Sequence, residues 1–355
     1  MTRSLSSSLA ALALVWAALP ALAETAAPAA PAIDASTASP FEYAASGKKA
    51  ARDAAEAAAD PAGAKVVGGQ LADQGEWPWQ VALTMADKPV GVDSQFCGGS
   101  MVLDQWVLTA AHCVVWPDEQ GNEIIVQPGE ISILVGTNKL DGTGDRVPVE
   151  AIHYHPSYTA DQFDYDIALI KLARKPTAPY KTVEVPDAAF GDILQQPGIT
   201  TIVTGWGLQN GGTPSADLRE AQIQMLDREM CNTAMMEARA EDAAQGFSYA
   251  VMALDVGDDA AYPLWDQLVA AAPQPMSENM ICSGTFEGGK TSCSGDSGGP
   301  LVVPLEDGSY IQAGIVSWGL TGSAGHGCEE KAMFSAYTNV SRFVPWLNEV
   351  ISANP

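Results

Sequence analysis

The run TSCSGDSGGP at positions 291–300 is the most informative segment for the fold and chemistry of this chain. It places Ser297 between Gly295 on one side and Gly298 and Gly299 on the other. Glycines allow tight turns and let a ligand approach the backbone without a Cβ in the way. The amides of Gly295 and Ser297 can then point together at a developing oxyanion, where each donor is typically worth about 3 kcal/mol. The run predicts a nucleophilic serine in an anion-binding loop.

A serine hydroxyl becomes a good nucleophile only beside a base that a third group holds in place. Two upstream segments supply such groups. The segment WVLTAAHC at 106–113 is an apolar strand that leads into His112. The segment DYDIALIKL at 164–172 carries an aspartate in front of a second apolar run. We assign the third group to Asp166 rather than Asp164 because it directly precedes the Ile-Ala-Leu strand.

Together the motifs TAAHC, DIAL and GDSGGP, in this chain order, resemble the trypsin/chymotrypsin family of serine proteases. The resemblance extends from about Val66 to the C-terminus and includes WPWQVA at 77–82, TGWG at 204–207 and SWG at 317–319. It implies an all-β fold of two antiparallel six-stranded Greek-key barrels, with the active site between them and a C-terminal helix. It also implies an endopeptidase that works through an acyl-enzyme, without a cofactor.

The resemblance assigns a role to each motif residue. Ser297 would attack the scissile carbonyl, His112 would accept its proton, and Asp166 would hold the imidazole tautomer. The amides of Gly295 and Ser297 would form the oxyanion hole. The substrate backbone would add to a strand edge as in β-augmentation, and the residues expected at this edge are Ser317, Trp318 and Gly319.

The six cysteines suggest disulfides, because the N-terminus predicts export. Six cysteines allow fifteen pairings in principle, and the residues alone do not choose among them. The family resemblance implies Cys97–Cys113, Cys231–Cys282 and Cys293–Cys328, each closing a loop worth roughly 3–4 kcal/mol.

The N-terminal region divides into two expected segments. Residues 1–23 read as a signal peptide, with a basic start, an apolar core and a small-residue cleavage site. Residues 24–65 hold 18 alanines and four prolines, a composition that suits a flexible pro-segment better than a packed core. We therefore expect a soluble secreted product, extracellular or periplasmic.

From residue 66 to 355 the pattern is that of a single protease domain with two cores, divided near 185–200. Short β-branched and aromatic runs, as at 106–109, 131–135 and 199–204, predict strands of a sandwich or barrel. A helix should end the chain, capped by Ser341. Its apolar stripe comprises Phe343, Trp346, Leu347, Val350 and Ile351.

Charge limits the possible partners. Residues 66–355 hold 37 acidic and 13 basic residues, a net charge of −24. Such a surface repels nucleic acid and anionic membranes, so protein or peptide substrates are the expected partners of a monomer. The segment between Gly136 and Val147 is short and lacks the carboxylates of the family's calcium loop, so we expect no metal there.

The pocket positions depart from the trypsin pattern. The pocket base lies six residues before the nucleophile and is Thr291, with Ser292 beside it, so the floor is neutral. One wall position keeps Gly319, whereas Ser335 narrows the other. This combination favours a small or medium neutral substrate residue before the scissile bond (P1). An alternative is Lys/Arg specificity, with the negative charge supplied by Glu329 and Glu330.

A second departure is the length of the chain between Cys231 and Cys282. The added stretch, about 237–275, has seven acids, one arginine and an Ala-rich character. It suggests partial helix over an outer subsite or a partner surface, and a tolerated loop without function is the alternative.

The start of the domain resembles an activation junction. Lys65 precedes Val66 in the sequence KVVGG. In the family, cleavage there frees an amino group that pairs with the aspartate before the nucleophile, here Asp296. Since Thr291 disfavours cleavage after lysine, a separate trypsin-like activator is expected. A catalytically silent binding protein is the rival function, disfavoured because all three triad positions are intact.

Overall fold

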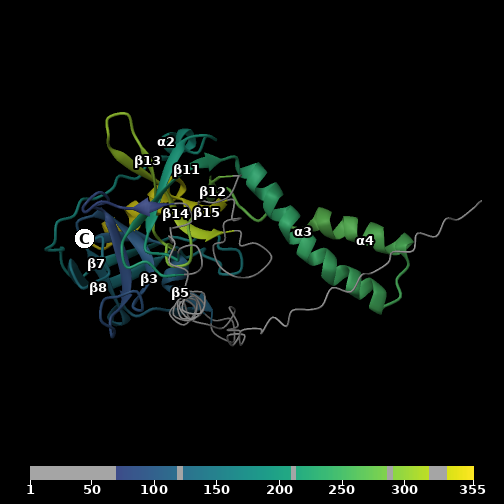
Figure 1. The fold of residues 1–355 in the computed structure, drawn as a ribbon, viewed down its shortest axis with the longest axis horizontal. Helices are drawn as coiled ribbons and strands as arrows, with labels where there is room; N and C mark the ends of the chain where they lie inside the picture. Colours follow the sequence, from purple (N-terminus) through teal and green to yellow (C-terminus); the bar gives the residue numbers. More distant parts are fainter. Residues whose placement is uncertain (1–68, 118–122, 209–212, 286–290, 320–333) are drawn as a thin grey trace, which may run out of the picture. The chain divides into compact units, whose positions relative to one another are not determined.

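The computed structural model describes residues 69–117, 123–208, 213–285, 291–319 and 334–355, all within the compact unit Ile33–Pro355 (Figure 1). The predicted signal peptide, pro-segment and activation junction lie outside these residues. The strands are β1 (Gln70–Leu71), β2 (Gln80–Met85), β3 (Gln95–Leu103), β4 (Trp106–Thr109), β5 (Val115–Pro117), β6 (Glu123–Ile125), β7 (Ile131–Val135), β8 (Asp145–Tyr154), β9 (Ala168–Leu172), β10 (Thr200–Gly205), β11 (Arg219–Leu226), β12 (Met280–Gly284), β13 (Pro300–Pro304), β14 (Tyr310–Gly319) and β15 (Phe334–Asn339). The helices are α2 (Ala188–Leu194), α3 (Arg228–Ala253), α4 (Asp258–Ala271) and α5 (Val344–Ala353).

The first barrel is a closed antiparallel sheet in the order β2-β3-β4-β9-β8-β7. The predicted strands at 106–109 and 131–135 are confirmed as β4 and β7. Because β4 pairs with β9 so that Thr109 faces Ala168, the end of β4 lies beside the start of β9. This register brings the segments that follow β4 and precede β9 to one rim of the barrel.

The second barrel runs β11-β10-β13-β14-β15-β12 and closes through a β11–β12 pairing, with β1 added at β11. The predicted strand at 199–204 is present as β10, shifted by one residue. The two six-stranded barrels confirm the expected fold. Each has an apolar interior, and buried side chains that include Trp206, Val302 and Ile315 belong to the same cluster as the first barrel's core.

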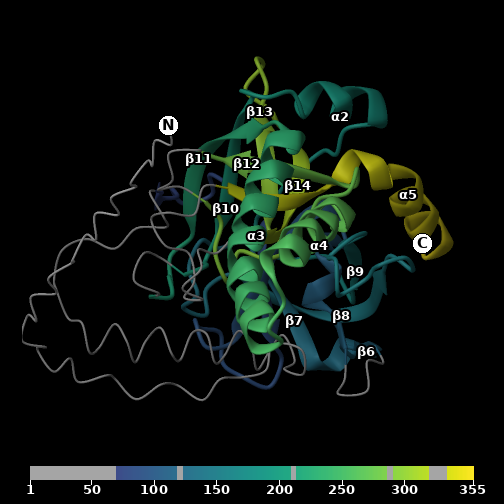
Figure 2. The same cartoon turned by 90° about the vertical axis from the view of Figure 1, so that its right-hand side faces the viewer.

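The stretch between Cys231 and Cys282 folds as two helices, α3 and α4, which lie side by side (Figures 1 and 2). Asp227 caps α3, because its Oδ1 accepts a hydrogen bond of 2.9 Å from the Met230 amide. The expected partial helix is confirmed, and it is longer than expected because it starts before residue 237. Within the described ranges, no helix is long and apolar enough to cross a membrane.

The C-terminal helix is confirmed, but the predicted cap is wrong. A short 3-10 turn, Val340–Phe343, precedes α5, which begins at Val344. The Ser341 hydroxyl is buried and donates to Oδ1 of Asn339 at 2.8 Å, so it cannot cap the helix. The apolar stripe packs on the core as expected, with Leu347 fully inside.

Two of the three implied disulfides are present. Cys97–Cys113 ties β3 to the turn after β4, and Cys231–Cys282 ties the start of α3 to β12. The third implied pair, Cys293–Cys328, stays a prediction because Cys328 lies outside the described residues.

The first barrel should lose stability when its core is truncated. Leu108 is fully buried in β4, so Leu108→Ala removes apolar contacts and leaves a cavity, lowering the free energy of unfolding by about 2–5 kcal/mol. Urea denaturation under non-reducing conditions measures this loss. The matched control is Ile193→Ala on α2, where the side chain is 59% exposed and the expected change is under about 1 kcal/mol. Equal losses in the two variants would contradict this placement of the core.

Candidate active site

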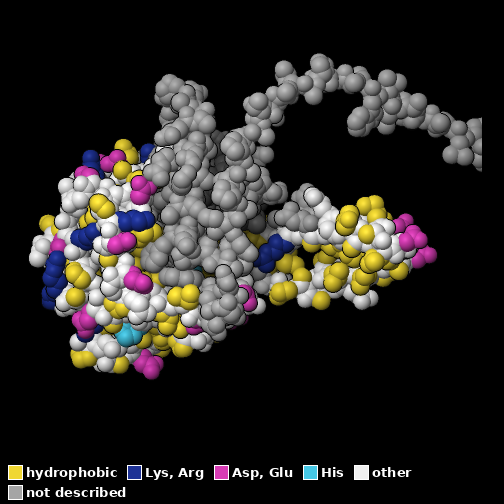
Figure 3. Space-filling model, turned by 90° about the horizontal axis from the view of Figure 1, so that it is seen from below, with side chains coloured by type: hydrophobic (Ala, Val, Ile, Leu, Met, Phe, Trp, Pro, Cys, Tyr) yellow, Lys and Arg dark blue, Asp and Glu magenta, His cyan; other side chains and the backbone are white. Residues whose placement is uncertain are grey.

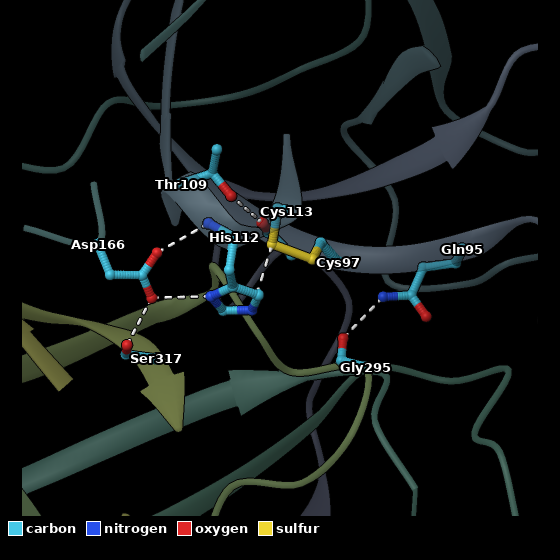
Figure 4. Close-up of a disulfide and its surroundings, with 9 residues drawn as sticks. Gln95, Cys97, Thr109, His112, Cys113, Asp166, Gly295 and Ser317 are labelled. Atoms are coloured by element: carbon cyan, nitrogen blue, oxygen red, sulfur yellow. Dashed lines mark hydrogen bonds and ion pairs between the residues drawn. A yellow bond between two sulfur atoms is a disulfide. The ribbon is translucent and has the colours of Figure 1, made fainter. Parts of the chain in front are cut away.

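His112 and Asp166 meet at the rim where β4 ends and β9 begins (Figure 4). His112 lies in a one-turn 3-10 helix, Ala111–Cys113, that the Cys97–Cys113 disulfide fixes to β3. The Asp166 carboxylate is fully buried. Its Oδ1 accepts the His112 backbone N–H at 2.8 Å, and its Oδ2 lies 2.8 Å from Nδ1 of the imidazole. Two contacts therefore fix the ring relative to the carboxylate.

The second barrel also holds Asp166. The Ser317 hydroxyl on β14 donates to Oδ2 at 2.5 Å, and the Thr338 hydroxyl on β15 donates to the Asp166 carbonyl at 2.6 Å. Sequence analysis assigned Ser317 only to the substrate edge and gave Thr338 no role. These contacts join residues 151 and 172 positions apart, so only strand pairing in the folded chain brings them together.

The loop that carries Ser297 packs against the turn that carries His112. The Ser297 carbonyl accepts the Gly98 amide at 2.7 Å. Gly298 has a φ of +77°, and a Cβ built there would lie 2.2 Å from the Thr109 hydroxyl and 3.1 Å from Sγ of Cys113. A side chain at position 298 would therefore collide with the first barrel. This close approach places the half-buried Ser297 next to the turn that carries His112.

No hydrogen bond joins the Ser297 hydroxyl to the His112 imidazole among the described residues. Nε2 of His112 lies 3.8 Å from Sγ of Cys113. Catalytic hydrogen bonds are often long or poorly aligned without substrate and tighten in the reacting complex. The arrangement brings the loop of Ser297 to the turn on which His112 contacts the Asp166 carboxylate.

The predicted oxyanion loop is held from both sides. Gly295 has a φ of +98°, and its carbonyl accepts a hydrogen bond of 2.8 Å from the buried Gln95 amide (Figure 4). The Asp296 carboxylate is buried and accepts the backbone amides of Gly207 and Cys293 at 2.8 Å each. Sequence analysis missed Gln95, which no motif singled out.

The residues that the sequence predicts for the specificity pocket lie in contact with one another. Thr291, Ser292 and Ser335 are all buried. The Ser335 hydroxyl lies 2.6 Å from the Thr291 hydroxyl and accepts from the Ser292 hydroxyl at 2.8 Å. A Cβ added to Gly319 would lie 3.2 Å from the Ser335 oxygen, so the two wall positions face each other. The alternative charge donors, Glu329 and Glu330, lie outside the described residues.

The C-terminal end of strand β14 is paired on one side only. β14 pairs with β13 only as far as Ile315, whereas its pairing with β15 continues to Gly319. Among the described strands, none pairs with the β13 side of the segment Ser317–Gly319. Trp318 is half-buried at the middle of this edge. An extended peptide can add there through backbone hydrogen bonds.

Two buried phenols near the site stay neutral. Burial raises the pKa of Tyr158, and the negative charge of Asp166 raises it further. Burial also raises the pKa of Tyr337, which lies behind the hydroxyls of the pocket floor. Neither side chain adds charge to the site. The sulfurs of Cys97 and Cys113 lie near His112, but they are bonded to each other and offer no thiolate to a metal.

Comparison with known proteins agrees with this geometry. Residues 66–347 match the family model Trypsin. The chain is 34% identical to an anionic trypsin of Canis lupus familiaris over 82% of this chain and 91% of the relative, and 31% identical to a tryptase of Mus musculus over 81% and 88%. It is 29% identical to transmembrane protease serine 9 of Rattus norvegicus, of which it spans only 22%. The chain belongs to the trypsin family of serine proteases and is a serine endopeptidase.

Proposed function

We propose that this protein is a secreted monomeric endopeptidase in which Ser297, His112 and Asp166 form the catalytic triad. The observation that carries the proposal is the buried Asp166 carboxylate bonded to His112 beside the loop of Ser297. Export is supported by the signal-like residues 1–23. Protein or peptide chains are the substrates, and no cofactor or metal takes part.

The reaction proceeds in two halves. The Ser297 oxygen attacks the scissile carbonyl while its proton moves to Nε2 of His112, and the resulting oxyanion accepts hydrogen bonds from the amides of Gly295 and Ser297. His112 then gives the proton to the leaving amine, and the C–N bond breaks. Water attacks the acyl-enzyme in the same way, restoring Ser297. Asp166 keeps the imidazole oriented and stabilises its charged form.

The rival proposal is a binding protein on the same scaffold. A fluorophosphonate probe separates the two, since it forms a covalent bond only with an activated serine. Labelling of the processed protein at Ser297 supports the endopeptidase. Absence of labelling in correctly processed, folded protein would favour the binding protein.

Loss of the nucleophile or base should abolish turnover. Ser297→Ala and His112→Ala should each lower kcat/KM for a peptide substrate by at least about four orders of magnitude, and the double variant should be no worse, because the two groups act as a unit. Stopped assays on purified, processed protein measure this. Ser294→Ala, an exposed serine three positions away, is the matched control and should stay active. Near-native hydrolysis by Ser297→Ala would refute the assignment.

The pocket floor supports a preference for neutral P1 residues of small or medium size. Thr291, Ser292 and Ser335 satisfy one another's hydroxyls and offer no carboxylate. Burying a lysine ammonium or an arginine guanidinium against them would leave a charge without a partner, which costs several kcal/mol.

A panel of peptides that differ only at P1 should show this preference. We expect Ala, Val or Leu to exceed Lys and Arg by at least about tenfold in kcat/KM, because the floor is neutral. Thr291→Asp should raise cleavage after Lys and Arg, whereas the uncharged Thr291→Asn should not. A tenfold preference of the wild type for Lys or Arg would instead support a pocket charged by Glu329 or Glu330.

Activation by cleavage after Lys65 is supported by two observations. The sequence KVVGG begins at Lys65. Asp296, the expected partner of the new amino group, is 3% exposed, and a Cβ on Gly205 would lie 2.0 Å from its Oδ1. A buried ion pair forms well only when both charges are present, so the new amino group would help to hold Asp296 and the neighbouring Gly295 in place. The neutral pocket implies that another protease makes this cut.

Processing should therefore need added trypsin. Wild-type and Ser297→Ala precursors should stay intact alone and yield a new N-terminus at Val66 when trypsin is added, as read by N-terminal sequencing. Lys65→Gln should block that cut. After cleavage, Asp296→Asn should have low activity because the amino group lacks a charged partner. Rapid maturation of wild type alone at Val66 would show self-activation and contradict the neutral pocket.

A further inference from the structure

The inserted helix α3 contacts the proposed substrate edge of β14 through the side chain of Arg239. The guanidinium carbon of Arg239 lies 5.9 Å from the ring centroid of Trp318, within the range of a cation–π contact. Trp318 is the middle residue of the unpaired β14 edge, next to Ser317 on the triad side and Gly319 on the pocket side. A segment that is absent from the ordinary family pattern thus touches the place where substrate is proposed to bind.

The position of Arg239 is set by a rigid base. The Cys231–Cys282 disulfide joins α3 to β12, and the Asn232 side chain both accepts from the Met276 amide at 2.8 Å and donates to its carbonyl at 3.2 Å. Met235 is fully buried in a small cluster that Trp318 adjoins. Arg239 follows Met235 by four residues, so the two lie on one face of the helix, one turn apart.

The guanidinium is available for a ligand. Arg239 is exposed, and it forms no ion pair with any side chain that the structure describes. By contrast, Arg174 and Arg342 pair with Asp145 and Asp192. A guanidinium offers planar paired donors that match a carboxylate, and the contact with the indole limits where it can point.

Three acids, Glu237, Glu241 and Asp242, lie within three residues of Arg239 in the sequence, and the described Glu237 side chain forms no ion pair with it. The acids at the far end of the hairpin formed by α3 and α4 are more distant. Figure 3 shows hydrophobic side chains gathered over the hairpin and acidic ones at its far end. The exposed hydrophobic residues of the hairpin include Tyr249, Met252, Leu254 and Tyr262. α3 runs about 20 Å from Arg239 to its last residue, which exceeds the screening length of roughly 8 Å at physiological salt.

We infer that Arg239 and Trp318 together form a binding site for an acidic side chain of the substrate, located at P2 to P4, the second to fourth residues counted back from the scissile bond. This inference rests on the proposed function. A peptide paired with Ser317–Gly319 runs past Trp318, and alternate side chains of an extended strand face the same side. A glutamate or aspartate there meets the guanidinium of Arg239 while its methylenes contact the indole.

Matched peptides test the site in the trypsin-processed protein. All share one neutral P1 residue and one scissile bond, and carry Glu, Gln or Lys at P2, P3 or P4 in turn. At one of these positions we expect Glu to exceed Gln by about three- to fivefold in kcat/KM, with Lys below Gln, and the ratio should fall at high salt. In Arg239→Gln the ratio should fall to about one, and Arg239→Lys should keep only part of it.

Arg228→Gln is the matched control, because it removes an arginine of the same helix that does not contact Trp318. It should keep the preference for Glu. A Glu preference that persists in Arg239→Gln, or equal cleavage of Glu and Gln peptides at all three positions by wild type, would overturn this site and leave the endopeptidase intact. Failure of the processed wild type to cleave any peptide, the neutral ones included, would overturn the proposed function and this site with it.

Discussion

The buried carboxylate of Asp166 is the constraint on which the site depends. A fully buried charge is stable only when hydrogen bonds replace its lost hydration. Here the replacements come from two barrels: the amide and imidazole of His112 from the first, and the Ser317 hydroxyl from the second. Because neither barrel alone satisfies the carboxylate, formation of the site and docking of the barrels are one event.

The same logic governs the loop around Ser297. The Ser297 carbonyl accepts a hydrogen bond from the Gly98 amide, and the Gly295 carbonyl accepts one from the Gln95 side chain. Gly298 packs closely against Thr109. Each contact crosses from the second barrel to the first. Ser297 is thus located by glycine-sized clearances and backbone hydrogen bonds.

Much of this could be predicted from the sequence, for a physical reason. His112 and Asp166 each adjoin a short apolar strand, and local β-branched patterns show such strands well. Thr338 and Gln95 could not be found, since their contacts depend on pairings between distant segments. The prediction that Ser341 caps the C-terminal helix was wrong because capping rules use only the neighbouring residues in the sequence. In the structure its hydroxyl donates to Asn339, and the helix begins three residues later. The Ala-rich insertion indicated helix but not where α3 would begin.

The end of β14 that β13 does not pair has a consequence for which proteins the enzyme would cleave, if substrates bind there as proposed. Among the described residues, Ser317–Gly319 continue β14 past its pairing with β13, and a substrate bound there as proposed would add as an extended segment. A polypeptide already committed to helix or to an interior strand must first release that segment by local opening, whose free energy ranges from near zero at frayed ends to the full stability of a core. Discrimination among protein targets would then be partly conformational, with linkers and loosened termini cut long before folded interiors.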